Sequence, residues 1–185
     1  YLDTATALGK LVSQLAEGQI SSLTIKYSGE LAAYSTPTLK AAVLVGFLGP
    51  VSEEKVNLVN ANLLATQRGL RIFEETDTAS AAYNASITIV ANTDKGSFSL
   101  TGTRNQQATH IDQVNDNLKD VVPSSEYLLF IEHQDKPGMI GALGTLTGSH
   151  DINIAFMAVG REAPRGKAMM VVCCLLYTSA AADER

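Results

Sequence analysis

The apolar pattern of this chain runs through one set of helix-like and strand-like segments, breaks at a polar stretch, and then starts again. The break covers residues 116–125 and contains Pro123 followed by two serines, a composition typical of a linker. A restart of the pattern indicates a second buried core, because each core needs its own set of facing apolar positions. With 185 residues, the chain is long enough for two small domains. We therefore predict one domain over residues 1–124 and another over residues 125–173.

The first domain combines helical and alternating segments. Its first segment has apolar residues at i, i+3, i+4 and i+7, the spacing of an amphipathic helix. Asp3 or Thr4 can cap this helix, and Gly18 suits its end. Residues 22–27 alternate as in a half-buried strand, and Pro37 suits the first turn of a second helix. We also expect a short helix capped by Asn60, followed by a strand meander over residues 70–75, 85–92, 97–103 and 110–115. These elements predict an α/β domain with a mostly antiparallel sheet.

The segments after the linker predict the order strand, helix, strand, strand. The strands are expected over residues 127–131, 152–160 and 168–172, and the helix over residues 137–149. This order is the first two thirds of a split β-α-β, or ferredoxin-like, unit. Ile140, Leu143 and Leu146 are expected to face the sheet, and Gly141 and Gly144 to allow close packing of the helix. The predicted fold class is therefore α+β, with the α/β domain followed by a partial ferredoxin-like βαββ domain.

Charge and composition exclude several classes of partner. The formal net charge is −5, which argues against nucleic acid because phosphate binding needs clustered Lys and Arg. No basic run points to a membrane surface, and no stretch approaches the ~20 apolar residues of a spanning helix. Cys173 and Cys174 are adjacent, so they form neither a disulfide framework nor a zinc site. We expect a cytoplasmic protein in a reducing compartment.

No catalytic motif stands out. His110, His133 and His150 are far apart in the sequence, and none belongs to a spaced metal motif such as H-E-x-x-H. The glycines after residue 137 do not match the dinucleotide pattern G-x-G-x-x-G. We therefore expect no catalytic residues, no metal and no cofactor site in this chain.

The most informative group of residues lies where a strand runs into a helix. His133 ends the strand, Asp135 follows, and Gly138 and Met139 start the helix, with Asn153 beyond it. A helix start offers unpaired N–H groups and a favourable dipole to an anion, while Asp135 can accept from an ammonium group. A group that binds an anion beside a group that binds a cation is the arrangement expected of a binding site for a free amino acid. A purely structural interpretation, with Asp135 as a helix cap and Asn153 as a strand start, remains open from the residues alone.

These residues carry a family resemblance. Residues 126–172 resemble the ACT domain, a β-α-β-β-α-β ligand-binding module, through the run Asp135-Lys136-Pro137-Gly138-Met139-Ile140-Gly141 and the later Ile152-Asn153-Ile154. The earlier part is similar to the intervening regulatory domain of bacterial D-3-phosphoglycerate dehydrogenases. That similarity lies in the runs Tyr27-Ser28-Gly29-Glu30-Leu31-Ala32 and Val56-Asn57-Leu58-Val59-Asn60-Ala61. The resemblance implies the regulatory part of an NAD-dependent enzyme of L-serine biosynthesis, whose NAD-binding and catalytic domains would precede this segment.

The resemblance also implies site residues and partners. It makes L-serine, or a similar amino acid, the feedback inhibitor, bound between subunits of a homo-oligomer by His133, Asp135, Asn153 and the backbone near Gly138 and Met139. A second anion site in the first domain would involve His110 and Lys119. Two alternatives stay open: the regulatory part of another amino-acid enzyme, such as an iron–sulfur L-serine dehydratase, and a module that only oligomerises. Residues 174–185 resemble translated sequencing-adapter sequence, so we expect a non-native tail that replaces the last ACT helix and strand.

Overall fold

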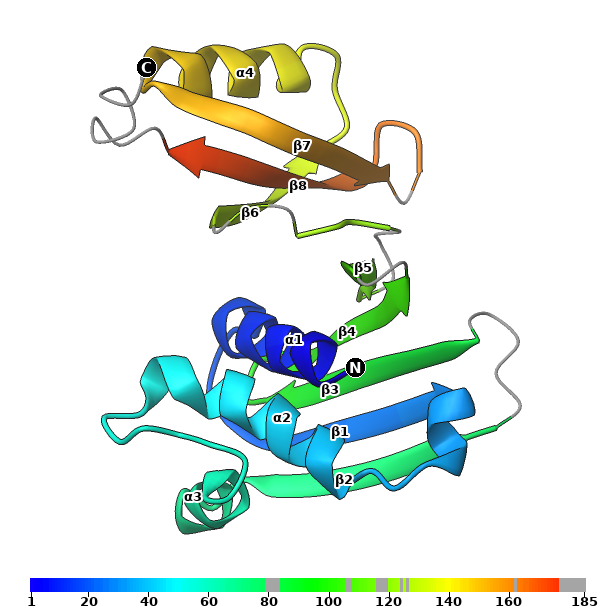
Figure 1. Ribbon diagram of the computed structural model, residues 1–185. Helices are drawn as coiled ribbons and strands as arrows, with labels where there is room; N and C mark the ends of the chain where they lie inside the picture. The colour runs from blue at the N-terminus through cyan, green and yellow to red at the C-terminus, as the bar shows by residue number, and fades with distance from the viewer. Residues whose placement is uncertain are drawn as a thin grey trace, which may run out of the picture. The chain divides into compact units, whose positions relative to one another are not determined.

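The computed structural model describes residues 1–78, 84–105, 108–115, 120–123, 125, 127–161 and 163–176. The chain divides into two compact units, Tyr1–Asp116 and Asn117–Arg185 (Figure 1). This division falls in the polar segment 116–125, and each unit contains helices and strands of its own.

The helices of the first unit are α1 (Leu2–Leu15), α2 (Pro37–Leu48) and α3 (Ala61–Gln67), with short 3-10 turns at Glu30–Ala33 and Gly49–Val51. Pro37 occupies the first turn of α2 as predicted. The expected capping of α1 is wrong: Tyr1 is the N-cap residue, and Asp3 and Thr4 lie inside the first turn. Gly18 has a φ of 91° but lies beyond the end of α1, where a Cβ atom would collide with the Asp94 carboxylate.

Five strands form the sheet of the first unit in the order β2-β1-β3-β4-β5. Their bounds are β1 (Ile20–Gly29), β2 (Arg71–Asp77), β3 (Ala85–Thr93), β4 (Gly96–Asn105) and β5 (Ala108–Val114). The pairs β1–β3, β3–β4 and β4–β5 are antiparallel, which confirms the mostly antiparallel α+β prediction. A tight turn at Asp94 and Lys95 joins β3 to β4, since Thr93 pairs with Gly96.

The expectation that all four later strands form one meander is wrong for β2. This strand pairs in parallel with β1, from Ser22 opposite Arg71 to Ser28 opposite Asp77. Parallel neighbours need a crossover connection that returns the chain to the same end of the sheet. The segment with α2 and α3 provides this crossover, so β2 occupies the edge of the sheet beside β1.

One face of the five-stranded sheet is covered by α1 and α2 (Figure 1). Leu23, Ile25 and Tyr27 of β1 point into this interface and have no exposed surface, as their alternation predicted. The two helices approach each other closely at Gly9 and Gly46. A Cβ atom at either glycine would collide with a backbone carbonyl of the other helix, so only glycine allows this distance between the helices.

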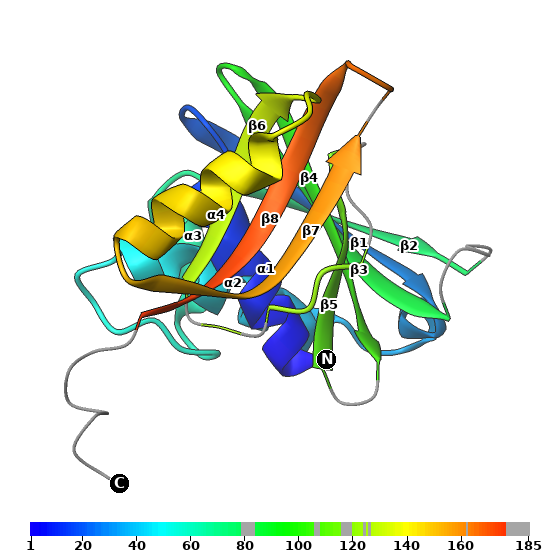
Figure 2. The ribbon, with the colours of Figure 1, turned by 90° about the horizontal axis from the view of Figure 1, so that it is seen from above.

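The second unit contains β6 (Tyr127–Gln134), α4 (Met139–Ser149), β7 (Ile152–Arg161) and β8 (Lys167–Leu176). The sheet order is β6-β8-β7 and both pairings are antiparallel. The last strand therefore inserts between the two strands that flank the helix, which is a split arrangement. The helix lies over one face of this sheet (Figure 2). The strand–helix–strand–strand order agrees with the sequence prediction, and the further assignment to the ACT fold stays a prediction.

The predicted packing face of α4 is partly wrong. Met139 and Leu143 pack against the core residues Met170, Val172 and Cys174 of β8, and Thr147, one turn further, is 6% exposed. Ile140 and Leu146 are instead 55% and 58% exposed. Small differences in side-chain size and in helix rotation decide such a face, and an apolar helix gives no clear amphipathic signal.

The glycines of α4 also differ from expectation. A Cβ atom added at Gly141 or Gly144 would have nothing within 4 Å, so these glycines do not mediate close packing against the sheet. They leave part of the helix surface without side chains, between the exposed Ile140 and Leu146.

Strand β8 extends into the predicted tail. Cys174 pairs with Tyr127 on one side and with Ile154 on the other, and Leu176 pairs with Ile152. The rest of that segment, residues 177–185, lies outside the described part of the chain. Among the described residues, no helix has the length and apolar character needed to span a membrane.

Candidate functional site

The junction between β6 and α4 presents the start of a helix. Gly138 is the N-cap residue of α4 with a φ of 90°, a conformation that favours glycine. No side chain of the described residues caps this helix, and the Met139 N–H makes only a long bond of 3.5 Å to the Lys136 carbonyl oxygen. Backbone N–H groups at this helix start are therefore available to an anion.

Asp135 lies beside this helix start and is held in place by the turn between β7 and β8. Its N–H donates to the Gly166 carbonyl oxygen at 2.9 Å. Its carboxylate atom Oδ2 accepts from the Arg165 N–H at 3.3 Å and lies 3.5 Å from Nη1 of Arg161. The Asp135 side chain is 22% exposed, so an oriented, partly exposed carboxylate belongs to the segment between β6 and the N-cap residue of α4.

His133 is the last residue but one of β6 and is half-buried. Its Nδ1 atom lies 2.9 Å from the Gln134 carbonyl oxygen, which fixes Nδ1 as the protonated nitrogen when the ring is neutral. Its Nε2 atom is buried without a hydrogen-bond partner among the described residues. An unpaired buried acceptor of this kind has capacity for a further donor.

Asn153 lies at the opposite end of the same sheet. It belongs to the start of β7 and pairs with Leu175 of β8, whereas Gln134 of β6 pairs with Lys167. Leu175 is eight residues after Lys167 along β8, or roughly 26 Å at about 3.3 Å per residue. The strand register therefore leaves Asn153 far from the junction between β6 and α4, to which His133 and Asp135 belong.

An open hollow of about 430 Å³ lies at the Asn153 end and is lined by Gly148, Asp151, Ile152 and Asn153. Asp151 has a φ of 57° in the turn that leads into β7. The unit therefore presents two separate polar features, the Asp135 end at the start of α4 and the Asn153 end after its last turn.

The second predicted anion site cannot be assembled from the described residues. His110 lies on β5 opposite Thr103 of β4 and has an interaction partner of its own. Lys119 lies outside the described residues. This site stays a prediction. Among the described residues, no group of three or more His, Cys, Asp or Glu side chains could hold a metal ion.

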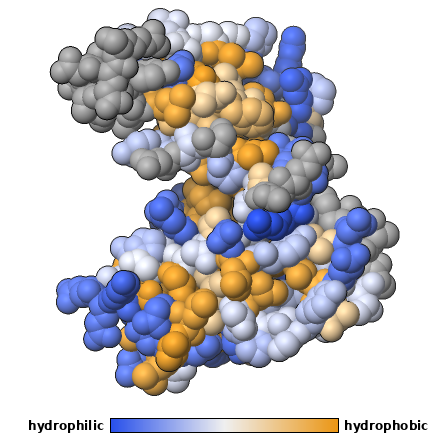
Figure 3. Space-filling model, in the orientation of Figure 1, coloured by the Kyte–Doolittle hydropathy of each residue, from blue (hydrophilic) through white to orange (hydrophobic). Residues whose placement is uncertain are grey.

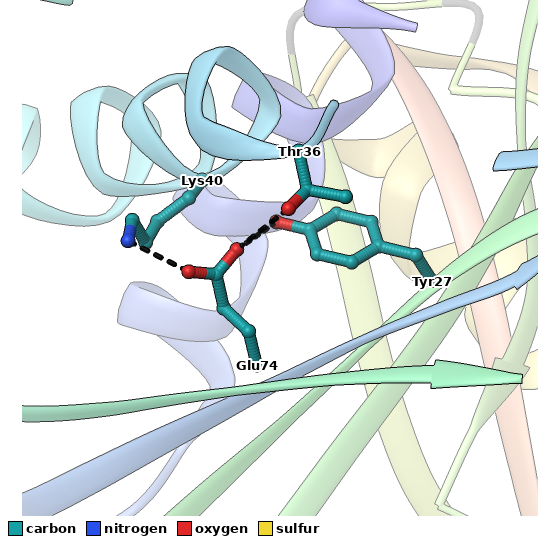
Figure 4. Close-up of polar contacts among 4 residues, drawn as sticks. All are labelled: Tyr27, Thr36, Lys40 and Glu74. Carbon is teal, nitrogen blue, oxygen red and sulfur yellow. Dashed lines mark hydrogen bonds and ion pairs between the residues drawn. The ribbon is translucent and has the colours of Figure 1, made fainter. Parts of the chain in front are cut away.

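A polar cluster in the first unit was missed from the sequence (Figure 4). Glu74 of β2 accepts from Lys40 Nζ at 2.7 Å, from Thr36 Oγ1 at 3.0 Å and from the Tyr27 hydroxyl at 3.4 Å. These contacts attach the start of α2 to β1 and β2. The sequence offers two signals for this cluster, Lys40 one turn after Pro37 and an acidic residue, Glu74, in a segment with strand character. Neither signal shows that the two side chains form a pair.

Burial raises the pKa of the Tyr27 phenol, and the nearby Glu74 charge raises it further. The unfolded chain releases this proton near pH 10, where free tyrosine titrates, while the folded chain retains it. The contribution of Tyr27 to stability is therefore complete below about pH 10. Above that pH it falls by up to about 1.4 kcal/mol per pH unit.

We expect Tyr27→Phe to remove this loss of folding stability above pH 10. The variant should be less stable than the parent chain by about 1 kcal/mol at pH 8, because it lacks a hydrogen bond to a charged group. The difference should shrink between pH 10 and 11, measured by urea unfolding with circular dichroism. Tyr34→Phe is the control, since Tyr34 is 68% exposed. A difference between Tyr27→Phe and the parent that stays constant with pH would contradict the expectation.

Comparison with known proteins places these observations in a family. A family profile described as the D-3-phosphoglycerate dehydrogenase intervening domain matches residues 1–115. A D-3-phosphoglycerate dehydrogenase of Synechocystis sp. is 40% identical over 177 residues, which cover 93% of this chain and 31% of the relative. Relatives of the same name from Methanocaldococcus jannaschii and Bacillus subtilis are 36% and 34% identical, and again 93% of this chain is covered.

The chain spans about a third of the length of these curated relatives. The family profile covers most of the chain, including α1 to α3 and β1 to β5 of the first unit. The chain therefore belongs to the D-3-phosphoglycerate dehydrogenase intervening domain family.

Proposed function

We propose that this chain is the regulatory part of a cytoplasmic, NAD-dependent D-3-phosphoglycerate dehydrogenase of L-serine biosynthesis, and that it binds L-serine as a feedback inhibitor. The family of residues 1–115 and the names of the relatives support the parent enzyme. The observation that carries the binding proposal is the oriented Asp135 carboxylate beside the uncapped start of α4.

The chemistry of the two groups suits a free amino acid. The ammonium group of serine would donate to Asp135, and its carboxylate would accept from N–H groups near Gly138 and Met139. The helix dipole adds about 0.3–1 kcal/mol, whereas each hydrogen bond to a charged group contributes roughly 1.5–3 kcal/mol. The hydrogen bonds therefore determine which ligand is preferred, and the dipole favours the correct orientation.

The separation of Asp135 and Asn153 favours a site shared by two chains. In a two-fold symmetric dimer, the Asp135 end of one chain can lie against the Asn153 end of its partner. Serine bound there would contact both subunits and stabilise one arrangement of the oligomer. Such coupling to a distant active site is typically about 1–3 kcal/mol, or roughly 5–150-fold.

The direct test is serine binding by the chain and by Asp135→Asn. We expect L-serine to shift backbone amide resonances of residues 133–142 in two-dimensional NMR. The variant, which has a neutral amide in place of the carboxylate, should bind about 10- to 100-fold more weakly. Glu132→Gln serves as the matched control, because it makes the same change of charge at an exposed position of β6. Equal serine affinity for Asp135→Asn and the parent chain would refute the site.

A second candidate function is oligomerisation without a ligand. Apolar side chains lie at the surface along β7 (Figure 3), where Phe156 and Val159 are 39% and 37% exposed. Exposed apolar side chains on a strand at the edge of a sheet favour association with another chain. Native mass measurements with and without serine separate the two functions: oligomers that do not change with serine support the second one.

A further inference from the structure

Arg161 was not part of the predicted site, yet it is the charged side chain that contacts Asp135. It ends β7, and its Nη1 atom lies 3.5 Å from Oδ2 of Asp135. The Arg161 side chain is 59% exposed, so a ligand in solution can reach it. The Arg165 N–H donates to the same Oδ2 atom.

The arrangement leaves the second carboxylate oxygen available. Among the described residues, both contacts of the Asp135 side chain use Oδ2 and none uses Oδ1. A fixed cation and an open anionic acceptor therefore lie side by side on the molecular surface. Arginine suits such a position, because its planar group can bind a carboxylate through two parallel hydrogen bonds.

A ligand that approaches Oδ1 with an ammonium group also approaches Arg161. A simple amine would be repelled by the guanidinium, since like charges at this distance oppose each other. An α-amino acid avoids this repulsion, because a single carbon atom separates its ammonium group from a carboxylate that the guanidinium attracts. A pair of this kind favours zwitterions over amines by charge alone.

We infer that Arg161 is a specificity-determining residue that binds the carboxylate of the effector together with the N–H groups at the start of α4, while Asp135 binds its ammonium group. The inference rests on the proposed function, and it deepens that proposal by selecting α-amino acids over amines of the same shape. Residues 161 and 135 come from opposite sides of the sheet order, on β7 and after β6. The fold of the unit is therefore what brings the two charges together.

The experiment compares L-serine with L-serinamide, which keeps the ammonium group and hydroxyl but lacks the carboxylate. Affinities of the 185-residue chain and of Arg161→Gln are measured by NMR titration. For the parent chain we expect serine to bind at least about tenfold more tightly than serinamide. Arg161→Gln should weaken serine binding about tenfold and leave serinamide binding unchanged or stronger, so that the preference for serine falls at least about tenfold.

Two further variants identify the source of the effect. Lys167→Gln removes one positive charge at the same end of β8, and Lys167 makes no contact with Asp135 among the described residues. It should change serine affinity less than about twofold, because exposed charges are strongly screened. Arg161→Lys keeps the charge without the planar donor group and should give an intermediate preference.

Each result has a defined meaning. An unchanged preference for serine in Arg161→Gln, with serine binding intact in the parent chain, overturns the role of Arg161 and leaves the proposed function standing. An equal loss of serine affinity in Lys167→Gln also overturns the role of Arg161, because the loss of any nearby positive charge would then explain the effect. Failure of the parent chain to bind serine overturns both the role of Arg161 and the proposed function.

Discussion

Replacing Gly46 with alanine is expected to lower the free energy of unfolding by about 2–4 kcal/mol. The added Cβ atom would collide with the carbonyl oxygen of Thr6 and lie 2.9 Å from the Lys10 nitrogen. These are backbone atoms of α1, so no side-chain rotation can relieve the collision. The two helices would have to separate, which would open the packed interface around Leu8 and Leu44, both fully buried.

Urea unfolding monitored by circular dichroism measures this effect, with Gly49→Ala as the matched control. Gly49 follows α2 directly, has a helical φ of −51°, and has nothing within 4 Å of an added Cβ atom. Gly49→Ala should cost much less than Gly46→Ala, because its Cβ atom meets no neighbouring element and is opposed only by the ring of the following Pro50. Similar stabilities for Gly46→Ala and Gly49→Ala would contradict the close approach of α1 and α2. Gly9→Ala tests the same contact from α1, through the Val43 carbonyl oxygen.

Mixing two chains that cannot bind serine is expected to restore binding if the site is shared between subunits. Asp135→Ala removes one half of the proposed site and Asn153→Ala the other, so each variant alone should bind at least about tenfold more weakly. In a mixed two-fold dimer, one site carries both changes and the other carries neither. An equimolar mixture should therefore recover about a quarter of the parent number of sites.

Isothermal titration of the mixture gives the number of restored sites. The control mixes Asp135→Ala with a chain that carries both substitutions, which can form no intact site and should stay inactive. Failure of the first mixture to restore any sites would contradict a shared site. If Asn153→Ala alone binds serine as tightly as the parent chain, the site lies within one chain. Asn153 would then have no role in it, because the strand register places it far from Asp135.

Most elements of the fold were predictable because each has a strong local signal. Pro37 and the apolar residues that follow specify α2, and alternation specifies the buried face of β1. The position of β2 was missed, although the two helices between β1 and β2 are a signal for a parallel crossover. Its residues are mostly exposed, so their pattern resembles that of any edge strand and does not reveal the neighbour.

The candidate site was predictable only where its residues are consecutive in the sequence. The run from His133 to Met139 forms one strand–helix junction, so its proximity follows from chain connectivity. Arg161 could not be assigned, because its contact with Asp135 depends on the register of β8 between β6 and β7. The close approach of Gly9 and Gly46 was missed for a similar reason: each glycine lies in an ordinary helical pattern, and only tertiary packing pairs them.

The distance between the Asp135 and Asn153 ends of the second unit has a consequence for measured affinity. If one ligand must touch both ends, it binds only where two chains meet, so ligand and self-association reinforce each other by mass action. Apparent affinity would then rise with the concentration of the protein itself, and dilution would weaken it without any change in sequence. A cell that makes more of the protein would thereby make each copy more responsive to the same amount of metabolite.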